Sequence, residues 1–396
     1  MQELVKISLC IIKNKIYHLH QYLIGRLIGP YIFSLIINQT YHTCYLNILP
    51  LIFLGFVHMY NLKFNSIWLS SGTHICALTS DKKTYCWGSN LFGQLGIGVG
   101  SSTLQLNYPQ TQVQGSYNFQ SLALGENHTC GLTDTKQIYC WGDNEFGQLG
   151  VNLSKESLPY STVPKLIQFA SKFPTPIRFL SIGATKNSTC GVTESQQVYC
   201  WGDNINGQIG IGSIGGNYIA PQLISTKKLI SLGSSMGNHI CGIDESKQAY
   251  CWGSNDKGQV GIGTSETNQA APTKVATYSA QNRDLRFSYI TMGAEHTCGI
   301  DLKGYAYCWG DNTYGQLGNS NFGEIQTLPI APVSTTQDKH TYDIVWNSIS
   351  AGDWHTCGIS QLDNGTYCFG RGSRGQLGIN SRFNESSPVL VTPSSK

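Results

Sequence analysis

Twelve of the fourteen cysteines are arranged in six pairs, so sulfur pairing is the first chemistry that the sequence suggests. Each pair flanks a polar turn, as Cys76 and Cys86 flank the turn at residues 80–82. In an antiparallel hairpin centred on that turn the two cysteines face each other, with Cα atoms about 4.5 Å apart at a non-hydrogen-bonded position. The sequence therefore predicts six disulfides: Cys76–Cys86, Cys130–Cys140, Cys190–Cys200, Cys241–Cys251, Cys298–Cys308 and Cys357–Cys368.

The sixth pair has one more residue between its cysteines than the others, and we expect a bulge or a shifted turn to take it up. Two other arrangements of the cysteines are possible. Buried free thiols are common in protein cores. A zinc site would need ligands that converge from two neighbouring units, and its ligands are usually two to four residues apart. We favour disulfides, which indicate an oxidising compartment, and we expect no metal and no cofactor.

The cysteines belong to a repeat that occurs six times. Its second cysteine lies in Tyr-Cys-Trp-Gly, or Tyr-Cys-Phe-Gly in the last copy, and Gly-Gln-(Leu, Ile or Val)-Gly follows at a fixed distance. Residues 66–396 divided among six copies give units of about 55 residues, which suits a blade of about four antiparallel strands. The sequence therefore predicts an all-β fold, a β-propeller of six repeats in residues 65–396.

The repeat His-Thr-Cys-Gly-Leu, Tyr-Cys-Trp-Gly and Gly-Gln-Leu-Gly resembles that of the regulator of chromosome condensation family, over about residues 66–396. The paired cysteines look more like the extracytoplasmic branches of that family, such as plant receptor-kinase ectodomains. The resemblance implies a propeller, commonly of seven blades. Because six units are countable here, we favour six blades and keep seven as the alternative.

Residues that recur once per unit are expected to have structural roles. We expect His74, His128, His239, His296 and His355 to form hydrogen bonds inside their blades rather than bind metal. The tryptophans beside the second cysteines should pack between blades, and the glycines of Gly-Gln-Leu-Gly should form turns.

Departures from the repeat are better candidates for binding, since binding residues lie on variable loops over a rigid scaffold. The sixth unit has Arg371 and Arg374 where other units carry different side chains, and Asp353 and Trp354 precede its first cysteine. These four residues form the candidate binding loop. Among the acceptor sequons, Asn152 is the candidate glycosylation site because it lies in a long linker.

The first 64 residues form an apolar segment that resembles a signal or an anchor. No Asp, Glu, Lys or Arg occurs in residues 27–62, and basic residues precede them. A polar interruption at residues 38–43 divides the segment into stretches shorter than the 20 or so residues of a simple span. Targeting to the secretory pathway or membrane anchoring is expected; the alternatives are a buried helical cap and an upstream extension that is not part of the mature protein.

Residues 66–396 carry 21 basic and 22 acidic residues, and this neutral domain argues against nucleic acid as a partner. No catalytic constellation stands out, so we expect no enzyme activity. The sequence predicts a secreted or membrane-anchored, lumenal or extracellular propeller that binds a protein, peptide or glycan. The alternative is an intracellular guanine nucleotide exchange factor, acting on a small GTPase, or a chromatin-type adaptor.

Overall fold

The computed structural model describes residues 63–70, 74–100, 108–171, 175–224, 227–235, 237–276, 284–330, 334–337 and 340–392. These residues form strands and turns and contain no helix, hence none of the length that a membrane crossing requires. The predicted anchor at residues 27–62, together with Cys10 and Cys44, lies outside the described residues.

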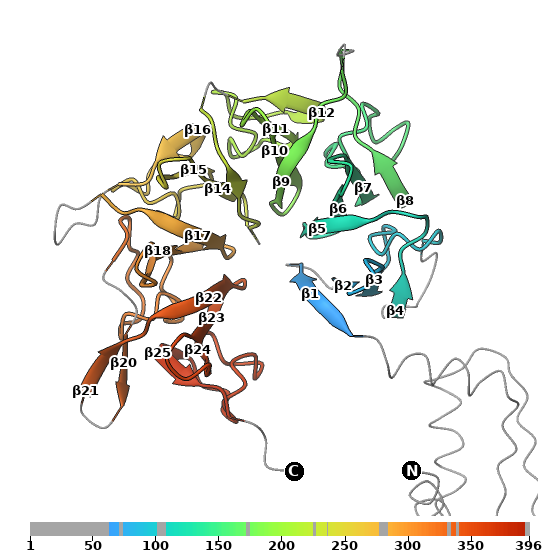
Figure 1. Cartoon of the computed structure of the whole chain (residues 1–396). Helices are drawn as coiled ribbons and strands as arrows, with labels where there is room; N and C mark the ends of the chain where they lie inside the picture. Colours follow the sequence, from blue (N-terminus) through green and yellow to red (C-terminus); the bar gives the residue numbers. More distant parts are fainter. Residues whose placement is uncertain are drawn as a thin grey trace, which may run out of the picture. The chain divides into compact units, whose positions relative to one another are not determined.

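Six antiparallel sheets follow one another around a common centre, from blue to red in Figure 1, and each begins with its innermost strand. We call them blades 1 to 6. The predicted all-β propeller of six blades is therefore confirmed. A separate hairpin, β20 (Ser334–Gln337) and β21 (His340–Asp343), is inserted between blades 5 and 6.

The strands of the first three blades have the following bounds. Blade 1 contains β1 (Phe64–Leu69), β2 (His74–Thr79), β3 (Thr84–Gly88) and β4 (Tyr108–Gln112). Blade 2 contains β5 (Phe119–Leu124), β6 (His128–Thr133), β7 (Ile138–Asp143) and β8 (Tyr160–Leu166). Blade 3 contains β9 (Phe179–Ala184), β10 (Ser188–Thr193), β11 (Val198–Asp203) and β12 (Asn217–Leu223).

The last three blades repeat the pattern with small irregularities. Blade 4 contains β13 (Ser231–Leu232), β14 (His239–Ile243), β15 (Ala249–Gly253) and β16 (Gln269–Lys274). Blade 5 contains β17 (Phe287–Met292), β18 (His296–Asp301) and β19 (Ala306–Gly310), and a bridge between Gly310 and Gln326 replaces its fourth strand. Blade 6 contains β22 (Trp346–Ala351), β23 (His355–Ser360), β24 (Thr366–Gly370) and β25 (Glu385–Leu390).

The second and third strands of every blade are joined by a disulfide. In each pair the cysteines are directly opposite in the sheet register, with Cα atoms 4.1 Å apart. All six predicted pairs are present. In blade 6 the register of β23 and β24 is unbroken, and the additional residue lies in the turn, where Asn364 adopts a φ of 54°.

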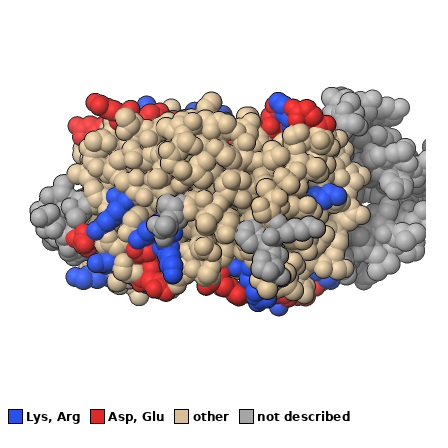
Figure 2. Space-filling view, turned by 90° about the horizontal axis from the view of Figure 1, so that it is seen from above, with Lys and Arg blue, Asp and Glu red and all other residues tan. Residues whose placement is uncertain are grey.

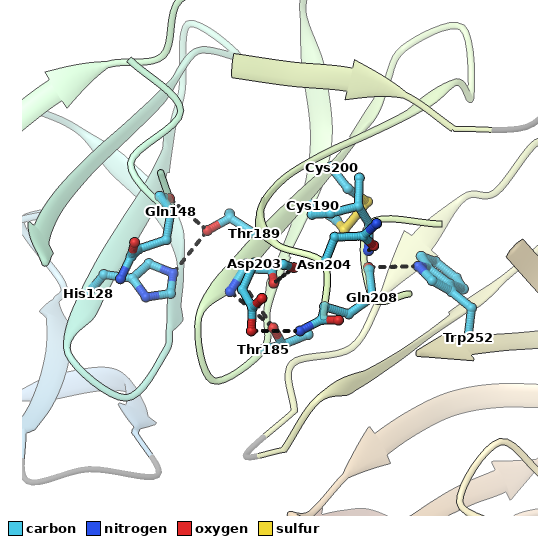
Figure 3. Close-up of a disulfide and its surroundings, with 12 residues drawn as sticks. His128, Gln148, Thr185, Thr189, Cys190, Cys200, Asp203, Asn204, Gln208 and Trp252 are labelled. Carbon is cyan, nitrogen blue, oxygen red and sulfur yellow. Dashed lines mark hydrogen bonds between the residues drawn. A yellow bond between two sulfur atoms is a disulfide. The ribbon is translucent and has the colours of Figure 1, made fainter. Parts of the chain in front are cut away.

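A chain of hydrogen bonds joins neighbouring blades, as Figure 3 shows between blades 2 and 3. His128 Nε2 in blade 2 lies 2.9 Å from Thr189 Oγ1 in blade 3, and that hydroxyl donates to the carbonyl oxygen of Gln148 in blade 2. The hydroxyl proton is used for Gln148, so the imidazole donates from Nε2. Trp201 Nε1 donates to the same carbonyl, at 2.9 Å.

This arrangement recurs at other junctions. The His–Thr pairs are His74–Thr129, His128–Thr189, His239–Thr297 and His296–Thr356, at 2.8–2.9 Å. The expectation that the histidines bond inside their own blades was wrong for these four, because each of the four imidazoles bonds to a threonine of the next blade. The expectation that the tryptophans pack between blades is confirmed for Trp141, Trp201, Trp252 and Trp309, which are all buried.

The junction between blades 3 and 4 uses different residues at the same two positions. Blade 3 has Ser188 in place of histidine, and blade 4 has Ile240 in place of threonine. Ser188 donates to the carbonyl oxygen of Asp203 within its own blade, at 2.7 Å. A small residue thus faces a large apolar one, and neither requires a polar partner across the junction.

The glycines after the Tyr-Cys-Trp-Gly strands allow neighbouring blades to approach closely. Gly147 has a φ of 82°, which favours glycine, and a methyl group placed on it would lie 2.8 Å from the Cα atom of Ile219 in blade 3. The predicted turn role is confirmed, and close packing against the next blade is an additional reason for glycine.

Candidate binding site

Two sets of loops meet at one end of the blades. In an antiparallel sheet the connection from the first to the second strand and that from the third to the fourth lie at the same end. Backbone hydrogen bonds hold the first set together around the centre: Glu126 donates to Lys186, Lys186 to Gly237 and Ala294 to Asp353, at 2.9, 2.9 and 3.2 Å. We call this series the collar.

The collar surrounds a cavity of about 540 Å³, which residues from blades 2 to 6 line. The lining residues are mostly polar: Glu126, Lys186, Asn206, Gly237, Asn238, Ser254, Asp256, Gln259, Asn268, Ala294, Glu295, Asp353 and Trp354. A volume of this size can hold one or two side chains of a partner or a small ligand.

The cavity is acidic. Four carboxylates line it, those of Glu126, Asp256, Glu295 and Asp353, whereas Lys186 is the one basic group among the lining residues described. The Lys186 Nζ atom lies 3.4 Å from a carboxylate oxygen of Glu126, so these two charges offset each other. Three carboxylates remain available to a positively charged ligand.

The carboxylates differ in how readily they take up a proton. Burial raises the pKa of Glu295, and the nearby Asp311 and Asp256 raise it further. Burial and then Glu126 raise the pKa of Asp353, against the smaller effects of Lys186 and Arg374. The pKa of Asp256 is lowered, because hydrogen bonds from Gln259 and Ser254 together outweigh its burial. A cation in the cavity would relieve the repulsion among these groups.

The predicted binding loop is assembled in the structure. The backbone N–H of Arg371 donates to the carbonyl oxygen of Trp354, at 2.8 Å, and the Arg371 guanidinium lies 5.0 Å from the Trp354 ring centroid. Asp353 and Trp354 line the cavity, and Arg374 is exposed. The structure therefore brings Asp353, Trp354 and Arg371 together at the edge of the cavity.

Tyr314 completes this group and was not predicted. The Arg371 guanidinium lies 5.1 Å from the centroid of its ring, so the cation stacks on both Tyr314 and Trp354. Glu126, Lys186, Asp256 and Glu295 were also missed. They occupy loop positions at which the residue type differs from one unit to the next. This variation, next to an otherwise constant motif, was the signal in the sequence that could have identified them.

The charged residues gather at the two ends of the blades. Figure 2 shows one side of the ring, on which Lys, Arg, Asp and Glu follow the upper and lower borders while much of the band between them is uncharged. Among the described residues no group of three or more His, Cys, Asp or Glu is arranged to hold a metal ion.

Comparison with protein families identifies the repeat. Residues 69–321 match the RCC1-like domain, and residues 303–359 and 363–396 match the regulator of chromosome condensation (RCC1) repeat. The chain belongs to the RCC1 repeat family. Together with the six disulfides, this confirms the predicted resemblance to a cysteine-paired member of that family.

The relatives that this RCC1-family chain resembles in sequence include a receptor and a probable ubiquitin-protein ligase. It is 29% identical over 313 residues to the ultraviolet-B receptor UVR8 of Arabidopsis thaliana, covering 79% of this chain and 66% of UVR8. It is 28% identical over 355 residues to the probable E3 ubiquitin-protein ligase HERC4 of Homo sapiens, covering 77% of this chain and 32% of HERC4. The chain thus spans less than two thirds of either relative.

The RCC1-type fold is also evident in solved structures. Prp20p from Saccharomyces cerevisiae superposes with a TM-score of 0.70 at 18% identity, over 89% of this chain and 80% of Prp20p. Human WBSCR16 gives 0.69 at 18% identity, over 84% and 82%. At this identity the likeness concerns the fold alone.

Proposed function

We propose that this chain is a secreted or membrane-anchored propeller of the lumen or cell exterior that binds a partner through the collar cavity. Of the partner classes considered, a protein, a peptide or a glycan, we favour a protein segment that carries Lys or Arg. The observation that carries the proposal is the acidic cavity of about 540 Å³ at the centre of a ring of blades that each contain a disulfide.

The six disulfides support the compartment, because such bonds persist where thiols are not kept reduced. The apolar residues 27–62 would provide targeting or anchoring. Asn152 is the proposed glycan acceptor, since its side chain is exposed next to a turn. Digestion of the native protein with a glycosidase specific for Asn-linked glycans, followed by peptide mass analysis, tests this assignment, with Asn152→Gln as the control.

Thiol mapping tests the compartment. Cells that produce the protein are treated with an alkylating reagent before lysis. Peptides of the purified protein are then analysed by mass without reduction. We expect the twelve repeat cysteines to be unmodified. Alkylation of all twelve would instead favour the intracellular alternative, an exchange factor acting on a small GTPase or a chromatin-type adaptor.

The charge and shape of the cavity support a basic partner. Three carboxylates not matched by Lys186 would bind a guanidinium or ammonium group, and the half-buried positions of Glu295 and Asp353 strengthen such a contact by excluding part of the water. Trp354 adds an aromatic surface at the edge, which is the type of residue that often dominates binding energy. We propose binding rather than catalysis as the role of the whole surface.

Titration of the full chain with an octa-arginine peptide tests the partner class, using an octa-glutamate peptide as the control ligand. We expect Glu295→Gln and Asp353→Asn each to weaken binding about tenfold, or 1.4 kcal/mol. Glu245→Gln is the matched control variant, because Glu245 is an exposed carboxylate in the β14–β15 turn at the opposite end of the blades. Equal binding of both peptides, or an equal effect of all three variants, would refute the proposal.

A further inference from the structure

The loop between β24 and β25 in blade 6 lacks two residues that the other five blades use to fix this loop. In blades 1 to 5 the first residue after the glycine of the third strand has a side-chain oxygen that accepts from the glutamine five positions later. The next residue is asparagine, whose side-chain oxygen accepts from a backbone N–H of the same loop. Blade 6 has Arg371 and Gly372 at these two positions, so neither contact can form. A departure of this kind is expected where a loop has a binding role.

The Arg371 side chain lies against aromatic rings instead. Its guanidinium carbon is 5.1 Å from the centroid of the Tyr314 ring and 5.0 Å from that of the Trp354 ring. The Nε atom donates to the Ser373 hydroxyl at 2.9 Å, and among the described residues the two terminal nitrogens have no acceptor. Contact with two rings restricts the rotamers of a long side chain. The terminal nitrogens therefore form a pre-positioned edge that can donate to two oxygen atoms of an anion.

Two more arginines lie on the same loop. Arg374 follows shortly after Arg371, Arg382 lies just before β25, and both of these side chains are exposed. The loop folds back on itself, because a methyl group placed on Gly372 would strike the carbonyl oxygen of Phe383. Within the described part of the chain none of the three arginines forms an ion pair. We call Arg371, Arg374 and Arg382 the arginine cluster.

The acidic cavity beside the arginine cluster limits the kind of anion that fits. Trp354 contacts Arg371 and also lines the cavity, so the cluster borders a surface that carries four carboxylates. A long polyanion, such as a nucleic acid or an anionic membrane, would extend over this surface and be repelled by the carboxylates. A single compact anion avoids that repulsion. The arginine cluster is therefore suited to one anionic group of a ligand.

The surroundings of the arginine cluster favour an aromatic ester as that group. A sulfate or phosphate ester has three terminal oxygens, one more than a carboxylate, and can accept from more than one guanidinium at the same time. Phe383, next to Arg382, is 79% exposed. An aromatic ring that carries the ester could pack against this side chain. Tyrosine is the amino acid whose ring hydroxyl can carry such an ester.

We propose that the arginine cluster is a second binding site on this face, for a tyrosine of a partner protein that carries a sulfate or phosphate ester. The terminal nitrogens of Arg371 would donate to two ester oxygens, Arg374 and Arg382 would add positive charge, and Phe383 would contact the tyrosine ring. Sulfate and phosphate esters present the same three oxygens, so the chemistry of recognition is shared. The site does not depend on the binding of a basic segment in the cavity.

Titration of the full chain with one peptide in four forms tests the proposal. The peptide is Ala-Gly-Gly-Tyr-Gly-Gly-Ala with both ends blocked, and its tyrosine is free, sulfated, phosphorylated or replaced by glutamate. We expect one ester form to bind at least about tenfold more tightly than the free tyrosine form, because a hydrogen bond to a charged group is worth about that factor. The tighter of the two esters identifies which of them the partner carries. Equal binding of all four forms, or a glutamate form that binds as tightly as the better ester, would overturn the proposal.

Two variants and a control distinguish the arginine cluster from general attraction to basic side chains. Arg371→Lys keeps the charge but loses the planar edge, Arg374→Gln removes a charge, and we expect each to weaken binding of the better ester about tenfold. Arg178→Gln is the matched control, because Arg178 is exposed just before β9, at the opposite end of the blades. An equal effect of all three variants, or no effect of Arg371→Lys, would contradict the assignment.

The octa-arginine titration separates this proposal from that of the cavity. We expect Arg371→Lys to bind octa-arginine as the parent chain does, while its affinity for the ester peptide falls. Binding of the ester peptide without binding of octa-arginine would refute the cavity proposal and support the arginine cluster. Binding of octa-arginine without preference for either ester would refute the arginine cluster alone.

Discussion

The Nε2 atom of His128 in blade 2 lies 2.9 Å from the Oγ1 atom of Thr189 in blade 3, so one hydrogen bond ties two parts of the chain that are 61 residues apart. The Nδ1 atom of the same imidazole is buried without a partner. The ring is therefore held as a neutral group that donates from Nε2, and both its charge state and its neighbour affect the stability of the junction.

Exchange of this pair for the pair at the next junction tests how the two residues depend on each other. Thr189→Ile alone leaves the buried imidazole without an acceptor and is expected to cost about 1–3 kcal/mol of unfolding free energy. His128→Ser together with Thr189→Ile reproduces the Ser188–Ile240 arrangement. We expect the double variant to be more stable, by at least about 1 kcal/mol, than the sum of the two single effects. Denaturant unfolding of the four proteins measures this coupling, and simple additivity would contradict it.

The buried histidines predict a loss of stability in acid. Burial lowers the pKa of His74, His128, His239 and His296 to about 3, against an ordinary value of 6.5. The unfolded chain therefore takes up protons first, so the contribution of each histidine is complete above pH 6.5 and is lost as the pH falls toward 3. Within that window each histidine lowers the unfolding free energy by up to about 1.4 kcal/mol for every unit by which the pH falls.

Denaturant unfolding at about pH 7, 5.5 and 4.5 measures this dependence. The His128→Ser, Thr189→Ile double variant is the matched control, because it removes one of the four buried imidazoles and restores packing at the junction. Its stability should fall less steeply with pH than that of the parent protein. Identical slopes would contradict the assignment of the effect to these histidines.

The disulfides are expected to differ in their rate of reduction. Cys357 is partly exposed, whereas the first cysteines of the other five pairs are buried. A soluble phosphine should therefore reach the Cys357–Cys368 pair first. Brief reduction of the native protein, followed by alkylation and peptide mass analysis, gives the order. Uniform labelling of all six pairs at early times would show that exposure of Cys357 does not control the reaction.

Binding of the basic peptide should depend on pH. Because the pKa values of Glu295 and Asp353 are raised, these carboxylates become neutral earlier than ordinary carboxylates as the pH falls. As the pH falls and these two carboxylates take up protons, the affinity for the octa-arginine peptide is expected to fall while the protein stays folded. Fluorescence titration at several pH values measures it, and the Glu295→Gln, Asp353→Asn double variant should lose most of the dependence. An unchanged pH profile in that variant would exclude these two groups as the cause.

The sequence predicted what is local and repeated. Opposed cysteines such as Cys190 and Cys200 could be recognised because register within a short hairpin depends only on the turn between them. The hydrogen-bond acceptor of His128 could not be recognised in this way, because it lies in the next unit. The direction of the imidazole depends on how two sheets pack. The candidate loop was found in part: Trp354 and Arg371 departed from the repeat, but Tyr314 joins them only through the arrangement of blades 5 and 6.

The number of blades in a ring is a different kind of problem. Each junction sets only the angle between two neighbours, and whether the last blade meets the first depends on the sum of those angles. Repeat counting gave six units, and the described residues form six blades.

Every described disulfide closes within one blade, and none crosses a junction. When the two ends of the chain are pulled apart, the load between blades is borne by side-chain hydrogen bonds and apolar packing, so the blades would detach one after another. Each detached blade would still keep a closed loop that removes about 30 Å from the length the chain can reach. The fully extended oxidised protein is thus shorter than its sequence suggests, and reduction of the six disulfides would lengthen it in six steps, the last pair releasing one residue more than the others.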